Sequence, residues 1–427
     1  MKIPTTLLLI YFCISCQQVT ETYDMVIEDV TIIDAKNSIL LPNQTIYIRQ
    51  DRILKITPSK GNSGIIADTT INGKGKYVLP GFWDMHVHTC WKDSLDKTVF
   101  PIFLQYGITG IRDLGGSLEI LNTFKNCAKV RAHLYPNLFG AGPILDGEKP
   151  IHPAFSISVT TNNFRIVLDS LRSQKVDFLK VYSLLPSSVL DSISAYSKEK
   201  KIDFAGHISE YITPEMAAVR GQKSFEHLNK LEELLDDSDR LNNFFGIADE
   251  HGSWLCPTLV IYQRKYEMAN GEFFYHSLFE DLDKDLKLEW EYLKEGSTPK
   301  IGDEIKESTL RYHKQKQLVK AFYDHQIPLL IGTDFAGMQF VYPGYSYHEE
   351  LKLMEEIGIP PFEILKMATW NPAVFLGISE SFGTIEANKI ADLVLFSENP
   401  VESIENTLSI DMVIKSGKIA DKTFAKN

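Results

Sequence analysis

Two histidines separated by a single residue, His86 and His88, end an apolar stretch of the chain that begins at Val78. Side chains two positions apart on a β-strand point to the same face, so both imidazoles would reach one point at the end of one strand. Neutral imidazole is the commonest side-chain metal ligand in proteins. The pattern therefore indicates part of a metal site, although an isolated pair of this kind is about as often two ordinary histidines.

Four more residues with suitable chemistry stand at comparable positions in later apolar segments: Lys180, His207, His227 and Asp334. Each alone has an ordinary explanation. A strand aspartate is often a helix cap, a lone histidine is often a core residue, and a strand lysine can extend its ammonium to solvent. Six such residues at matched positions are improbable by chance, and they predict one shared site.

The elements that must position these residues alternate between strand and helix through the middle of the chain. Eight candidate strands occupy roughly 250 residues: 78–88, 107–114, 133–140, 177–182, 203–208, 223–228, 254–261 and 328–335. Amphipathic helical segments between them include 162–173, 186–198 and 214–220. This is the count of an α/β (β/α)8 TIM barrel, whose functional groups gather at the carboxyl ends of the strands. A doubly wound sheet would need a glycine-rich phosphate turn, which the sequence lacks.

Shorter alternating segments flank the barrel on both sides, at 25–33, 44–49, 52–56, 391–396 and 412–419. Turn residues punctuate them. We therefore expect a small β-sandwich domain built from residues 24–77 and 383–422 together, with the barrel, residues 78–382, inserted between its halves.

A charged and aromatic stretch, about residues 262–323, separates the last two candidate strands. Its apolar residues recur at helical spacing, which predicts an inserted helical hairpin. This hairpin could be a lid over the active site, a contact between two copies of the chain or a longer barrel helix. The second alternative would make the protein a homo-oligomer.

The composition narrows the class of protein. The chain has 427 residues, 44% of them hydrophobic and 23% charged, which is typical of a globular protein and long enough for a barrel with an accessory domain. Its net charge of −12 argues against nucleic acid as a partner, because phosphate binding needs a basic surface. A small molecule is the expected substrate.

The amino terminus has the features of a targeting segment. Lys2 precedes an apolar run over residues 3–14, too short to span a bilayer as a permanent helix. Residues 13–16 at the end of this run resemble a bacterial lipobox, in which Cys16 would be the lipidated residue. Cys13 occupies the first lipobox position, which is usually Leu. We predict a lipoprotein signal peptide (1–16), a polar tether (17–23) and lipidation of Cys16. The protein would be exported and held at the membrane by the lipid alone, facing the periplasm or the cell surface. An ordinary cleaved signal is the alternative.

Beyond the tether the chain resembles the amidohydrolase superfamily. The likeness rests on the Leu-Pro-Gly-Phe sequence that precedes His86, on Gly-Thr-Asp at 332–334 and on the tail at 383–394. Asn388 stands where that tail usually has glycine, and asparagine tolerates the left-handed backbone better than most residues.

Three further segments are similar to the imidazolonepropionase-like and prolidase-like dipeptidases: Ser-Phe-Glu-His at 224–227, Cys-Pro-Thr-Leu at 256–259 and His-Glu-Glu-Leu at 348–351. Lys180 is similar to the lysine of the binuclear branch, which is carboxylated. The resemblance thus implies a binuclear metal-dependent hydrolase of this subgroup.

The resemblance also assigns roles to the six residues. His86, His88 and Asp334 would hold one divalent metal, His207 and His227 the other, and N6-carboxylysine at position 180 would bridge them. Zinc is the favoured ion, with manganese and cobalt as alternatives. A hydroxide shared by the metals would be the nucleophile. Asp334 would take its proton and pass it to the leaving amine.

Lys180 also bears on the reaction, because deaminases and imidazolonepropionase itself generally use one metal and do not need this lysine. We expect hydrolysis of a C–N bond, in a dipeptide or an N-acyl amino acid. His152 and Tyr182 are predicted to contact the substrate, since binding groups collect in the loops at the barrel mouth. A lactone or ester hydrolase is the alternative, and a non-catalytic binding lipoprotein is disfavoured because all six residues are retained.

Overall fold

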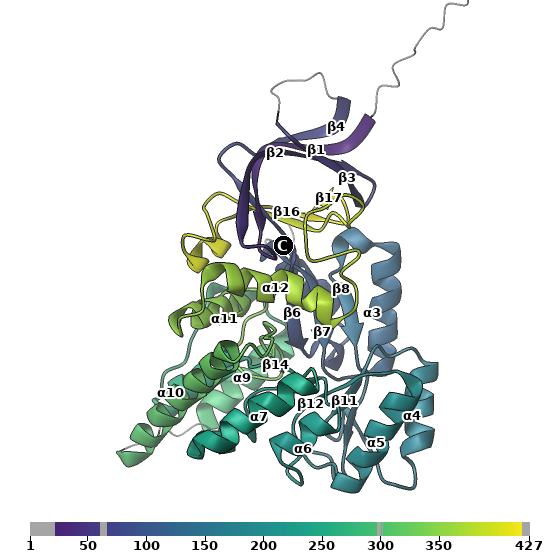
Figure 1. Ribbon diagram of the computed structural model, residues 1–427, viewed down its shortest axis with the longest axis vertical. Helices are drawn as coiled ribbons and strands as arrows, with labels where there is room; N and C mark the ends of the chain where they lie inside the picture. The colour runs from purple at the N-terminus through teal and green to yellow at the C-terminus, as the bar shows by residue number, and fades with distance from the viewer. Residues whose placement is uncertain (1–21, 60–65, 297–299, 301, 421–427) are drawn as a thin grey trace, which may run out of the picture.

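The computed structural model describes residues 22–59, 66–296, 300 and 302–420. Cys16 and the predicted signal peptide lie outside these residues. Strands from both ends of the chain form a sheet at one end of the molecule, and helices surround the strands of the middle segment (Figure 1). Within the described part of the chain, no helix is both long and apolar enough to cross a membrane.

The sheet at this end combines both termini. Its strands are β1 (Thr22–Asp34), β2 (Ile39–Arg49), β3 (Arg52–Pro58), β4 (Ile66–Asn72), β5 (Tyr77–Pro80), β15 (Leu393–Phe396), β16 (Ile410–Lys415) and β17 (Lys418–Ile419). They run in the order β17-β16-β15-β5-β1-β2-β3, and β4 pairs with β1. The short strand β5 joins the two ends of the chain, because it pairs in parallel with β1 and antiparallel with β15.

The predicted strand over residues 78–88 is in fact two strands in different sheets. β5 ends at Pro80, which has no N–H to continue a ladder, and β6 (Phe82–Val87) begins after Gly81. A Cβ on Gly81 would lie 2.0 Å from Thr109 Oγ1. The backbone therefore crosses from one sheet to the other at the one residue without a side chain.

The strands of the middle segment form two parallel sheets. One has the order β6-β7-β8 and the other the order β10-β9-β11-β12-β13-β14. After β6 they are β7 (Ile108–Asp113), β8 (Asn137–Gly140), β9 (Ile144–Asp146), β10 (Ser156–Ser158), β11 (Leu179–Val181), β12 (Phe204–Gly206), β13 (Ser224–Glu226) and β14 (Trp254–Cys256).

The segment 328–335 joins these two sheets into one curled sheet. Leu329 bridges in parallel to Leu255 of β14, and Phe335 bridges in parallel to Val87 of β6. Met85 N also donates to Ile331 O at 2.9 Å. These contacts are isolated bridges, so the strand predicted over 328–335 is extended chain with little regular pairing. The fold is α/β, as predicted.

Two other predicted strands end or begin at a proline. The strand predicted over 254–261 stops at Cys256, because Pro257 follows and a helix begins at Leu259. The strand predicted over 133–140 begins only at Asn137, after Pro136, and Ala132–Leu134 form a short 3₁₀ turn. In each case apolar side chains continue across a residue that cannot donate to a ladder.

The helices lie on the outside of the curled sheet (Figure 1). They are α1 (Leu95–Thr98), α2 (Phe100–Gln105), α3 (Leu118–Val130), α4 (Phe164–Ser173), α5 (Ser187–Lys200), α6 (Pro214–Val219), α7 (Ser238–Glu250), α8 (Leu259–Ala269), α9 (Lys284–Gly296), α10 (Asp303–Asp324), α11 (Tyr345–Glu356) and α12 (Pro361–Phe375). The three helices predicted between strands are confirmed as α4, α5 and α6. The stretch 262–323 is helical as predicted, formed by α9, α10 and most of α8.

Asn388 adopts the left-handed backbone that its place in the tail requires, with φ of +72°. Its N–H donates to Ile53 O at 2.7 Å. The turn therefore holds the carboxyl-terminal tail against β3.

Gly110 in β7 lies directly under the indole of Trp83, and a Cβ there would be 2.3 Å from the ring. Trp83 is fully buried and also packs against Phe139 and Phe382. Alanine at position 110 must displace this ring, so we expect Gly110→Ala to lower the free energy of unfolding by about 1–3 kcal/mol.

The matched control is Gly246→Ala, on the exposed face of α7, where an added Cβ meets nothing. It should raise the free energy of unfolding by about 0.5–1 kcal/mol, because alanine favours a helix over glycine. Denaturant titration of both variants measures the change in the free energy of unfolding. Equal changes in the two variants would contradict the packing described for Trp83.

Candidate active site

The structure brings the six predicted residues together at the carboxyl ends of the strands. His86 lies in β6 and Lys180 in β11, and the other four directly follow strands or lie in the segment 328–335. All six are buried. His86 Nε2 and His88 Nε2 lie 3.4 and 3.2 Å from the same oxygen, Asp334 Oδ1. The ring of His227 lies 4.5 Å from that of His86 and 4.9 Å from that of His207, measured between centroids.

Each of the four histidines uses its Nδ1 atom for a hydrogen bond to the surrounding protein. The partners are Glu226 Oε2 for His86 at 2.9 Å, Gly115 O for His88 at 3.1 Å, Ser183 Oγ for His207 at 3.0 Å and Thr258 Oγ1 for His227 at 2.7 Å. A hydrogen bond to one ring nitrogen fixes the tautomer and orientation that leave the other nitrogen for a metal. The Glu226 carboxylate and the Gly115 carbonyl can only accept, so His86 and His88 donate from Nδ1 and keep Nε2 for a metal.

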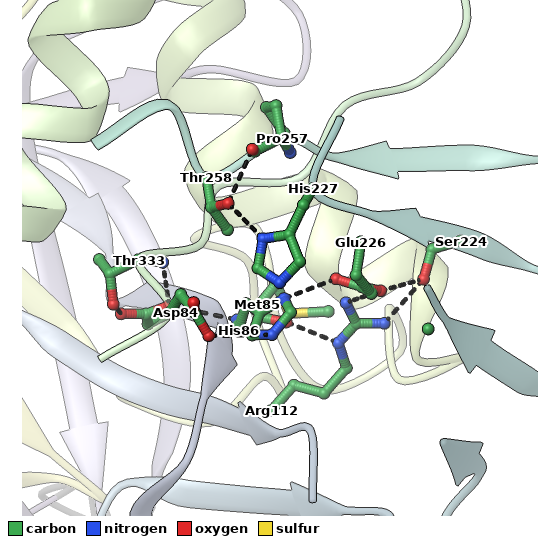
Figure 2. A network of polar contacts seen from close by, with 12 residues as sticks. Asp84, Met85, His86, Arg112, Ser224, Glu226, His227, Pro257, Thr258 and Thr333 are labelled. Atoms are coloured by element: carbon green, nitrogen blue, oxygen red, sulfur yellow. Dashed lines mark hydrogen bonds and ion pairs between the residues drawn. The ribbon is translucent and has the colours of Figure 1, made fainter. Parts of the chain in front are cut away.

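The hydroxyl of Thr258 sets the tautomer of His227. Its proton is donated to Pro257 O at 2.7 Å, so its oxygen accepts from His227 Nδ1 (Figure 2). The backbone at both residues is left-handed, with φ of +67° at His227 and +51° at Thr258, and Asp334 has φ of +62°. Such conformations cost about 1–2 kcal/mol per non-glycine residue and concentrate at functional sites.

Two buried atoms of this cluster have no hydrogen-bond partner among the described residues, His86 Nε2 and Lys180 Nζ. Buried polar atoms are rarely left unsatisfied without a reason such as an ion. The side-chain ligand atoms of His86, His88 and Asp334 all lie within 4.8 Å of one another. The donor set is rich in imidazole with one carboxylate, which suits zinc and related divalent ions. The residues therefore fit a metal centre.

Beneath the histidines lies a buried ion pair that spans three strands (Figure 2). Arg112 of β7 donates to Glu226 Oε1 at 2.7 Å, to Met85 O of β6 at 2.7 Å and to Ser224 Oγ at 3.1 Å. The other carboxylate oxygen of Glu226 accepts from His86. Arg112 and Glu226 are both fully inaccessible to solvent. The Arg112 guanidinium thus holds the Glu226 carboxylate in place, and this carboxylate sets the orientation of the His86 ring.

Three residues of this cluster, Lys180, His86 and Asp334, have pKa values below their usual ones. Burial lowers the pKa of Lys180 to about 8, although Glu226 and Asp334 oppose the shift. Burial and the Lys180 charge lower the pKa of His86 to about 4. For Asp334, burial would raise the pKa, but the surrounding histidines outweigh it and the pKa falls below its usual range. Neutral imidazoles and an ionised carboxylate are the forms that bind metal.

His152 and Tyr182, predicted to contact substrate, lie together at the edge of the cluster. His152 Nε2 is 3.0 Å from Tyr182 Oη, and the Tyr182 ring stacks on His207 at 4.0 Å between centroids. On the same side Trp91 stacks on His88 at 4.6 Å and on Phe155 at 4.7 Å. These rings form a half-exposed aromatic wall beside the histidines.

Sequence reasoning did not identify Arg112, Glu226, Trp91 or Thr258 as part of the site. A signal existed for two of them. Arg112 is a charged residue inside the apolar strand β7, and Glu226 immediately precedes His227 in the buried strand β13. A buried charge needs a partner, but the sequence does not tell which residue supplies it.

Comparison with known proteins identifies the family. The profile of the amidohydrolase family matches residues 187–420, which is more than half of the chain. An imidazolonepropionase from Christiangramia forsetii is 23% identical over 404 residues, covering 89% of this chain and 92% of that protein.

Solved structures with the same fold include a bottromycin amidohydrolase and a Xaa-Pro dipeptidase with methionine in its active site. The first has a TM-score of 0.75 and 20% identity over 92% of this chain and 86% of that one. The second has a TM-score of 0.71 and 19% identity over 92% of this chain and 99% of that one. The chain belongs to the amidohydrolase family. It is an enzyme that hydrolyses carbon–nitrogen bonds, in a family whose members depend on metal.

The ion pair beneath His86 gives a prediction about metal affinity. Glu226→Gln removes the charge that orients His86, and loss of such a partner typically weakens metal binding 10- to 100-fold. We expect a fall of about this size, measured by competition with a coloured chelator.

The matched control is Glu349→Gln, which breaks another buried pair, with Arg264. Removing one partner of a buried pair destabilises the fold in both variants, but only Glu226→Gln should change metal affinity. The role given to Glu226 is wrong if the two variants bind metal equally well.

Proposed function

We propose that this enzyme hydrolyses the amide or peptide bond of a dipeptide or an N-acyl amino acid at a centre of two divalent metal ions, with zinc as the favoured ion. The observation that carries the proposal is the cluster of four buried histidines, each held by a hydrogen bond at Nδ1, together with the buried, unpartnered Lys180. His86, His88 and Asp334 would hold one ion, and His207 and His227 the other.

Lys180 would bridge the two ions as N6-carboxylysine. A protonated ammonium does not bind metal, whereas the lowered pKa of this buried lysine provides the neutral amine that attacks carbon dioxide. The new N–C bond would form with loss of one proton and would give a carbamate, whose two oxygens are suitable metal ligands. This also removes an otherwise unsatisfied buried nitrogen.

Bound divalent ions supply Lewis acidity, which polarises a carbonyl and lowers the pKa of water. Asp334 would accept a proton from the attacking water, since its carboxylate is held ionised by the histidines around it, and would pass it to the leaving amine. His152 and Tyr182 would orient the scissile carbonyl from the aromatic wall, where their side chains are hydrogen-bonded to each other.

The substrate class is supported by what the relatives are called and by Lys180. The Xaa-Pro dipeptidase acts, by its name, on a dipeptide, whereas imidazolonepropionase does not. Since Lys180 distinguishes the two-metal subclass, we favour the dipeptide or N-acyl amino acid. Hydrolysis of a lactone or ester at the same centre is the second candidate, and a binding lipoprotein without activity is the third.

Two structural proposals accompany this function. We propose that the curled sheet is a closed (β/α)8 barrel over residues 78–382, because the bridges from segment 328–335 reach β14 on one side and β6 on the other. The sheet of the two termini would form the β-sandwich domain, residues 24–77 and 383–422. Lipidation of Cys16 would hold the exported protein at the membrane, which labelling with a radioactive fatty acid and a Cys16→Ser variant would test.

Metal analysis and activity together test the function. Protein purified with zinc should hold close to two equivalents of metal and hydrolyse members of a panel of dipeptides, N-acyl amino acids and lactones. Lys180→Ala should lose at least 10²-fold in kcat, because the bridge between the ions is lost, whereas the exposed Lys306→Ala should not.

Well under one equivalent of metal would contradict the metalloenzyme reading. Full activity of Lys180→Ala would contradict the two-metal centre. Labelled bicarbonate provides a direct check on the carbamate, since a ¹³C carbamate signal should be present in the wild type and absent from Lys180→Ala.

A further inference from the structure

A cavity of about 630 Å³ lies between α8 and α10, outside the cluster of histidines. Its lining includes Asn229, Tyr262, Lys265, Arg311 and Gln339. Ligand sites for small molecules typically measure about 300–1,000 Å³, so this cavity is large enough for an amino acid. Nothing in the proposed chemistry uses these residues.

The cavity is continuous with the loops that carry two of the six site residues. Asn229 lies on the chain just after His227, and Gln339 lies on the loop after Asp334. Tyr262 Oη accepts a hydrogen bond from the backbone N–H of Leu228 at 2.7 Å. The wall of the cavity is therefore tied to the backbone next to His227.

The cavity is lined by three cationic side chains and one carboxylate, those of Lys265, Lys300, Arg311 and Glu307. The ammonium of Lys265 has no ion pair or hydrogen bond within the described residues, and its nearest ring is that of Tyr262, 5.2 Å from the Nζ atom to the centroid. Arg311 differs, because Glu232 Oε2 accepts from its Nε at 2.8 Å. A solvent-exposed lysine on the wall of a cavity can bind an anionic ligand.

Lys265 also lies within the electric field of the candidate active site. Burial lowers the pKa of Lys265, and the negative charge of Asp334 opposes this shift. Because Asn229 lies two residues after His227 and Tyr262 contacts Leu228, one small substrate could span both regions.

We propose that the cavity binds the amino-acid half of the substrate and that Lys265 binds its free carboxylate. This inference rests on the proposed function and names the feature that the substrate must carry. Asp334, which would protonate the leaving amine, lies five residues before Gln339 of the cavity wall. The carboxylate of an α-amino acid is two bonds from that nitrogen. The acyl half would then lie against Trp91 and Phe155, on the other side of His88.

The first test compares an N-acyl amino acid with the same compound as its carboxamide, which lacks the charge. Lys265→Met should lower the ratio of kcat/KM for acid over carboxamide about 10- to 100-fold, the loss expected for one charged hydrogen bond. Lys265→Arg should retain most of the ratio. Lys306→Met, which removes an exposed cation at the start of α10, is the charge-matched control and should leave the ratio unchanged.

The second test measures binding without turnover. Isothermal titration of the zinc-loaded protein with a non-hydrolysable analogue, in which a methylene replaces the amide nitrogen but the carboxylate is kept, should show the same 10- to 100-fold weakening in Lys265→Met. If no panel compound is hydrolysed but this weakening is found, the proposed function fails and the carboxylate site stands. Equal ratios and equal affinities in the wild type and Lys265→Met would overturn the carboxylate site.

Discussion

The buried pair of Arg112 and Glu226 is the interaction on which the rest of the site depends. Removing two charges from water is costly, and the cost is offset only where every lone pair and proton finds a partner. Here the guanidinium bonds to a carboxylate, a backbone carbonyl and a hydroxyl, while the second carboxylate oxygen bonds to His86. Because these groups come from β6, β7 and β13, the pair holds three strands in one register and sets the direction of the first histidine.

Above this pair, the site combines rigid support with strained backbone. The strands end at a common level, and the residues that follow them include His227 and Asp334 in left-handed conformations. Hydrogen bonds from the backbone to neighbouring strands, such as Asp334 N to His86 O at 2.7 Å, hold them there. Free Nε2 atoms and an ionised carboxylate are thus presented before any metal arrives, which reduces the cost of ordering the site on binding.

The surroundings of the centre are asymmetric. Stacked aromatic rings from the loops after β6 and β9 lie beside His88, and a polar cavity lies between α8 and α10, next to the chain that follows His227. An unsymmetrical substrate with an apolar half and a charged half would fit this arrangement in only one direction. Under the proposed carboxylate site, the long helical insertion would contribute to substrate recognition, since α8 and α10 supply the walls of that cavity.

The sequence by itself determined the α/β class and the family, because strand–helix alternation and short motifs are local features of the chain. It also predicted six residues that the structure brings together, since each follows or ends an apolar segment. It also determined α4, α5 and α6 to within two residues. Prolines and Gly81 moved the ends of several strands, since apolar patterning continues past a residue that cannot pair. Only the tertiary structure decided which buried charge meets which: Arg112 and Glu226 are far apart in the chain, and so are Trp91 and Phe155. Their contacts arise from strand order and sheet curvature, which residue spacing along the chain does not encode.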